Sequence, residues 1–72
     1  MNQYYVLINK EHQYWNTDAQ EWSDQIWHAT IWTLPTAAKR YAEKLNVNYY
    51  AVAAIVMQEK FLLFEKGQDY GQ

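Results

Sequence analysis

Cysteine is absent from this chain of 72 residues, which also has only one proline, two glycines and two histidines. Without cysteine no disulfide framework holds the fold, and the absence fits a reducing cytoplasm. No apolar run approaches the roughly 20 residues that cross a bilayer, and Met1-Asn2-Gln3 lacks the basic residues that open an export signal. We therefore expect a soluble, cytoplasmic protein stabilised by good packing or by self-association.

Charge and residue types argue against several kinds of chemistry. The net charge of −2 argues against general affinity for nucleic-acid phosphates. Both glycines lie near the C-terminus, which excludes glycine-rich phosphate-binding loops. His12 and His28 lie far apart in the sequence and outside any metal-ligand spacing, and the one serine, Ser23, has no glycine-flanked nucleophile elbow. We expect no metal, no cofactor and no enzymatic activity.

The first half of the chain predicts one or two hairpins. Residues 4–8 are β-branched and aromatic, which favours a strand, and residues 9–12 form a polar turn. A second strand is expected near residues 13–15, and Glu21-Trp22 begins another short extended piece. Ser23 is a preferred helix N-cap, so we expect one helical turn within residues 23–29, followed by extended residues 30–32.

The second half predicts one main helix. Pro35 fits a first helical turn, apolar residues recur with a period of 3.6 as far as Leu45, and Asn46 suits the left-handed conformation that ends helices. The basic residues of this helix form a weak basic patch, and an ordinary solvated helix face is the simpler explanation for them. They are Lys39, Arg40 and Lys44.

Residues 49–57 are apolar on both alternate faces, and we interpret them as a central strand, with a buried helix as the alternative. Residues 58–60 form a polar break. Residues 61–64 then form either a returning strand or a short helix, and the tail 67–72 is expected to fray. No linker interrupts residues 1–72, so we expect a single domain.

Two patterns together resemble the small ββαβ proteins encoded by bacteriophages and prophages. They are Tyr5-Val6-Leu7-Ile8-Asn9 followed by Tyr14, and Ala29-Thr30-Ile31-Trp32 leading into a helix with Ala38 and Tyr41. The resemblance implies an α+β fold, in which a small antiparallel sheet has one main amphipathic helix packed across it. It also implies an accessory protein that acts by contact with a host or phage protein, for example as an inhibitor of a defence system, with no site residues to carry over.

Aromatic residues make up 18% of the chain and suit either a core or a binding surface. Trp27 and Trp32 have apolar neighbours, so we expect them in the core. Tyr14, Trp15 and Trp22 stand among polar residues and are the candidates for an exposed protein-binding patch.

The sequence thus favours a non-catalytic module that binds a protein partner. Homodimerisation belongs to the same prediction, because one helix in so short a chain leaves a strand that is apolar on both faces without a cover. The alternative is a carbohydrate-binding or single-stranded nucleic-acid-binding domain that stacks its ligand on exposed aromatic rings.

Overall fold

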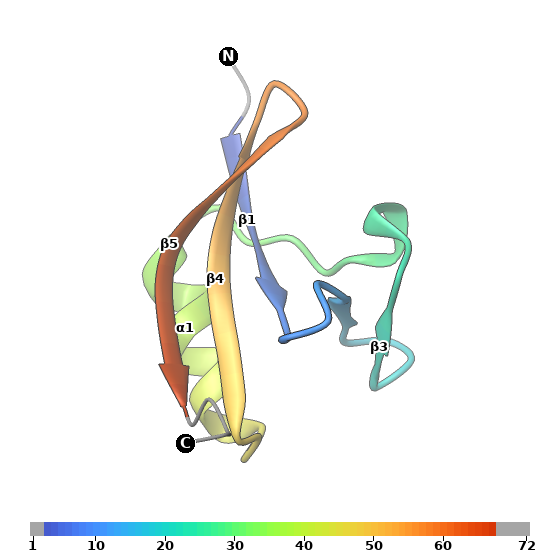
Figure 1. Cartoon of the computed structure of the whole chain (residues 1–72), viewed down its shortest axis with the longest axis vertical. Coiled ribbons are helices and arrows are strands. Elements are labelled where there is room, and N and C mark those ends of the chain that lie inside the picture. Colours follow the sequence, from blue (N-terminus) through green and yellow to red (C-terminus); the bar gives the residue numbers. More distant parts are fainter. Residues whose placement is uncertain (1–2, 68–72) are drawn as a thin grey trace.

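Five antiparallel strands in the order β3-β2-β1-β4-β5 form one sheet with an α-helix against it in the computed structural model, which describes residues 3–67 (Figure 1). The elements are β1 (Gln3–Ile8), β2 (Tyr14–Asn16), β3 (Glu21–Ser23), the 3-10 turn η1 (Ile26–His28), α1 (Pro35–Lys44), β4 (Tyr49–Val56) and β5 (Glu59–Gly67). The α+β class and the single main helix are confirmed. The sheet is larger than that of a ββαβ fold, since β3 and β5 extend its two edges.

The paired strands β1 and β4 form the centre of the sheet. Their ladder runs from Gln3 opposite Val56 to Ile8 opposite Ala51, and β4 is a strand as predicted. Because side chains alternate between faces, each central strand contributes to two separate cores. The helix-side core contains Leu7, Trp15, Ala38, Ala42, Tyr50 and Val52, and the core on the helix-free face contains Val6, Ile8, Ala51, Ala53 and Ile55.

Helix α1 lies against β1 and β4 and has the predicted extent. Pro35 occupies its first turn, and Ala38 and Ala42 are the residues it buries. These small side chains let the helix approach the sheet closely. Asn46, with a φ of 58°, adopts the left-handed conformation just beyond the C-cap Leu45. Pro35 and Asn46 therefore mark the beginning and the end of the helix, as the sequence indicates.

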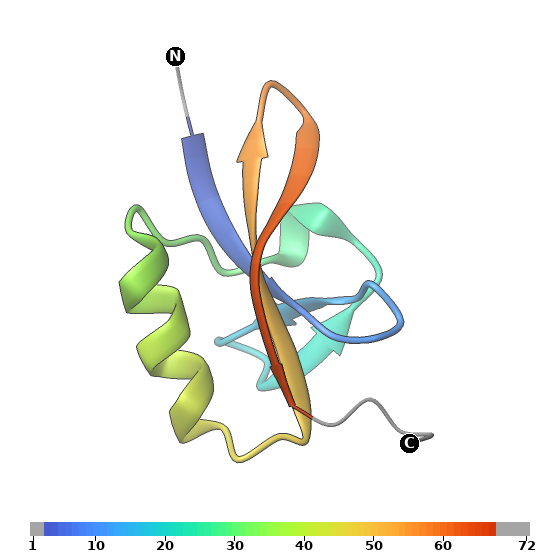
Figure 2. The same ribbon diagram turned by 60° about the vertical axis from the view of Figure 1, so that its left-hand side comes forward.

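The helix-free face is covered by the sheet itself. Its strands twist strongly, so that β5 crosses in front of β4 (Figure 2). Lys60 of β5 donates a hydrogen bond of 3.0 Å to the Tyr14 hydroxyl of β2 and lies 4.9 Å from the centre of that ring, although two strands separate β2 from β5. Ala51 and Ala53 of this face are buried, and the residues packed against their cluster are Tyr4, Tyr14, Ala29 and Tyr49. The expectation that one face of β4 lacks a cover is therefore wrong, because β4 is buried on both faces within the single chain.

The connections show smaller differences from the sequence prediction. The helical turn near residues 23–29 is the 3-10 turn η1, and Ser23 does not cap it but ends β3. Trp32 is extended as expected and exchanges two hydrogen bonds of 2.9 Å with Tyr5 of β1.

At the other end of the sheet, Met57 and Gln58 alone form the turn between β4 and β5. The predicted break at residues 58–60 is therefore placed too late, and residues 61–64 belong to a strand. Gly67 ends β5, and the rest of the predicted frayed tail, residues 68–72, lies outside the described residues. Among residues 3–67 no helix is long and apolar enough to span a membrane.

Candidate functional site

The tryptophans do not lie where their neighbours in the sequence suggest. Trp15, expected at the surface, is only 7% exposed, whereas Trp27, expected in the core, is 75% exposed. Trp15 lies in a strand, so its polar neighbours point to the opposite face. Its indole packs edge-on against Trp22, with ring centres 5.2 Å apart, and donates to the Tyr41 hydroxyl of α1 at 3.4 Å. Trp32 packs against the helix-side core as predicted.

The three residues predicted to form a binding patch are therefore not on one surface. Trp15 and Trp22 are paired across β2 and β3 and belong to the helix-side core. Tyr14 packs on the helix-free face beneath Lys60. The prediction of a joint exposed patch is wrong, because strand alternation sends Tyr14 and Trp15 to opposite sides of the sheet.

The remaining candidate residues have local contacts. Lys39 of the predicted basic patch lies 4.3 Å from the centre of the Phe64 ring of β5, while Arg40 and Lys44 are exposed on the same helix. His28 lies at the surface, where its Nδ1 and the Ser23 hydroxyl are 2.9 Å apart, and His12 is exposed in the turn after β1. Residues 3–67 contain no group of three His, Cys, Asp or Glu side chains placed to hold a metal ion.

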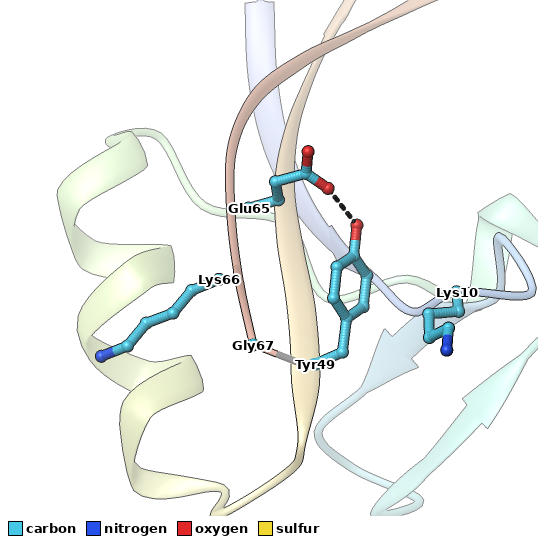
Figure 3. A pocket seen from close by; sticks show the side chains of 5 residues that line it. All are labelled: Lys10, Tyr49, Glu65, Lys66 and Gly67. Atoms are coloured by element: carbon cyan, nitrogen blue, oxygen red, sulfur yellow. Dashed lines mark hydrogen bonds between the residues drawn. The ribbon is translucent and has the colours of Figure 1, made fainter. Parts of the chain in front are cut away.

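A polar hollow lies beside the C-terminal end of β5 (Figure 3). Tyr49 donates a hydrogen bond of 2.6 Å to the Glu65 carboxylate across the two strands. Lys66 points the other way, towards α1, where it donates to Glu43 at 3.4 Å. That hydrogen bond, together with the lysine charge, lowers the pKa of the Glu43 carboxyl. The side chains around the hollow thus do not converge on one point.

The outer edge of β5 is the most unusual surface of the described chain. β5 ends the sheet and, within residues 3–67, pairs with β4 alone. Phe61, Leu62 and Leu63 follow one another along it, and each is about half exposed. Edge strands of natural proteins are usually short or carry charges that discourage pairing. This one spans nine residues and is apolar in its middle, so it offers both backbone groups and apolar side chains.

A β-bulge in the middle of β5 changes which side chains share a face. Phe64 pairs with Val52 and Leu62 pairs with the next residue of β4, Ala53, so Leu63 is the extra residue. After the bulge the alternation is shifted by one residue. Phe61 and Phe64 consequently lie on the same face, the one that α1 covers.

An apolar groove runs between this strand and the beginning of α1. Its volume is about 260 Å³. It is lined by Pro35, Thr36, Lys39, Val52, Leu63 and Phe64. Leu34, just before the helix, is 60% exposed. The groove and the apolar part of β5 share Leu63 and Phe64. We call the two together the β5 edge surface and define it by Leu34, Pro35, Phe61, Leu62, Leu63 and Phe64.

The sequence contains a signal for this surface. Residues 59–66 read Glu-Lys-Phe-Leu-Leu-Phe-Glu-Lys, with four apolar residues between two Glu-Lys pairs. The pattern alone does not distinguish a strand from a short helix, nor an edge strand from a central one. Those distinctions decide whether the apolar side chains are available to a partner.

Comparisons with models of protein families, with curated proteins and with solved structures find no match to this chain.

Proposed function

We propose that this protein is a non-catalytic protein-binding module that pairs an extended segment of its partner with the outer edge of β5. The observation that carries the proposal is the length and exposure of that edge, which leaves three consecutive large apolar side chains half exposed. Binding by strand addition derives affinity from main-chain hydrogen bonds and specificity from pockets for alternate side chains. The β5 edge supplies the first, and the groove beside α1 supplies the second.

The other functional predictions receive less support from the geometry. Stacking of sugars or bases needs a flat aromatic platform, but the rings of Trp15 and Trp22 meet at 69° and Trp15 is buried. Trp27 is exposed, and the His28 ring lies edge-on to it with ring centres 6.1 Å apart. Carbohydrate or single-stranded nucleic-acid binding stays a prediction, as do the phage origin, the role as an inhibitor and the cytoplasmic location.

The proposal is tested by selecting random peptides on sparsely immobilised protein. The edge variant Phe61→Lys/Leu63→Lys adds two charges to the β5 edge surface. Its matched control, Trp27→Lys/Ile31→Lys, removes two exposed apolar side chains and adds the same charge in η1 and in the segment between η1 and α1. We expect peptides that bind the wild type and the control with equal affinity and the edge variant at least about tenfold more weakly, a difference of roughly 1.4 kcal/mol.

Circular dichroism on all three proteins first establishes that both variants are folded. Peptides that bind the edge variant normally and lose affinity for the control would assign binding to the loop around η1 and contradict the proposal. Failure to select any peptide in an extended conformation would contradict it as well.

A further inference from the structure

We infer that the partner of the β5 edge is a second copy of this chain, paired antiparallel about a two-fold axis that passes between Leu62 and Leu63. The inference rests on the proposed function, because it names the partner of the same edge. Two-fold pairing uses one surface twice, so the surface must be complementary to itself. The sequence and shape of β5 meet that condition in charge, in apolar contacts and in the faces to which the side chains point.

Charge complementarity is the first argument. In this register, Glu59 of one copy lies opposite Lys66 of the other, and Lys60 lies opposite Glu65. Symmetry repeats each pair, so every charged residue between positions 59 and 66 meets an opposite charge. Directly opposed unlike charges stabilise an antiparallel pair of strands, and like charges destabilise it. Phe61 lies opposite Phe64, and this pairing covers the Phe61 side chain, which is half exposed in the single chain.

The β-bulge is the second argument. Residues that lie opposite each other in antiparallel strands point to the same face. In a two-fold pair of regular strands, two opposed positions that differ by an odd number would point to opposite faces, because side chains alternate along each strand. The shift at Leu63 reverses the alternation between the two halves of β5. Glu59 and Lys66 therefore share the helix face, because their β4 partners Val56 and Tyr50 do. A second copy has the same bulge at the same place, so the faces match in the three outer pairs, those of Glu59 with Lys66, Lys60 with Glu65 and Phe61 with Phe64.

The same holds for the inner charged pair. Lys60 and Glu65 both lie on the helix-free face, where they contact Tyr14 and Tyr49 respectively. Both side chains are exposed, and each has one tyrosine hydroxyl as its hydrogen-bond partner on that face. In the paired dimer, each of these side chains gains an opposite charge beside its tyrosine partner. Pairing of the two β5 edges joins both sheets into one and covers the exposed edge of each copy.

Exchange of charges tests the register. In Lys60→Glu alone, two pairs of glutamates oppose each other in the dimer, and in Glu65→Lys alone, two pairs of lysines do. When the two variants are mixed, both pairs become Glu with Lys. By sedimentation velocity from micromolar to millimolar concentration, we expect a dimer of the wild type, dimerisation roughly tenfold weaker in each single variant, and recovery in the equimolar mixture. The double variant Lys60→Glu/Glu65→Lys, which exchanges both charges, should dimerise like the wild type.

The outcomes separate this inference from the proposed function. A wild type that remains monomeric at millimolar concentration overturns self-pairing, whereas peptides selected on the β5 edge would still support the proposed function. The dimer interface lies elsewhere if the dissociation constant does not change with these charges, or if the equimolar mixture does not dimerise like the wild type. Either result also overturns the inference. Recovery in the mixture supports it directly, since two misfolded variants would not restore each other.

Discussion

The position of a single aromatic residue in this protein follows from strand alternation more than from its sequence neighbours. Trp15 stands between Tyr14 and Asn16 and is nevertheless buried, because it points towards the helix. Trp27 has Ile26 beside it but lies in a 3-10 turn that buries none of its residues. The sequence reveals which residues are aromatic, yet burial depends on the face to which each is turned and on what covers that face.

This contrast predicts unequal effects of removing the two indoles. Trp15→Ala should destabilise the fold by about 3–5 kcal/mol, because it leaves a cavity beside Trp22 and removes the hydrogen bond to Tyr41. Trp27→Ala should change stability by no more than about 0.5 kcal/mol. Urea denaturation followed by circular dichroism measures both values. Equal losses for the two variants would contradict the assignment of Trp15 to the core.

Among the elements, α1 and the central strands were predictable and the β4–β5 hairpin was not. Pro35 and Asn46 mark the ends of the helix, and the run of apolar residues marks β4. The hairpin lacks such a mark because its two-residue turn consists of Met57 and Gln58. Their φ angles of 51° and 69° are those that usually select Asn and Gly.

The backbone of this turn is therefore strained, and substitutions that relieve the strain should stabilise the fold. Replacing Met57→Asn and Gln58→Gly together should stabilise the protein by about 1 kcal/mol, because both replacements tolerate positive φ. Thermal unfolding should show a rise in Tm of about 4–8 °C for that gain. The control Met57→Ala/Gln58→Ala removes the same side chains without relieving the backbone and should give no increase. A control as stable as the Asn-Gly variant would show that side-chain loss, and not the turn conformation, is responsible.

For the molecule as a whole, the two cores explain how so short a chain folds without disulfides. α1 covers one face of the sheet, and the curl that brings Lys60 to Tyr14 covers the other. The sequence indicates that β4 is apolar on both faces, but not that its own sheet closes over it, since the curl depends on pairing across the whole sheet. For the same reason the apolar surface to which we assign partner binding lies at the β5 edge and not on the face of β4 or around Trp22.

Amide hydrogen exchange resolved along β5 tests the central claim, that the β5 edge pairs with another strand, most directly. If a second copy occupies the edge, the β5 amides that do not bond to β4 should exchange more slowly as the protein concentration rises, whereas amides around η1 should not change. If those β5 amides exchange as fast as exposed loop amides at every concentration, and stay fast when selected peptides are added, then the β5 edge is not a binding surface and the account is wrong.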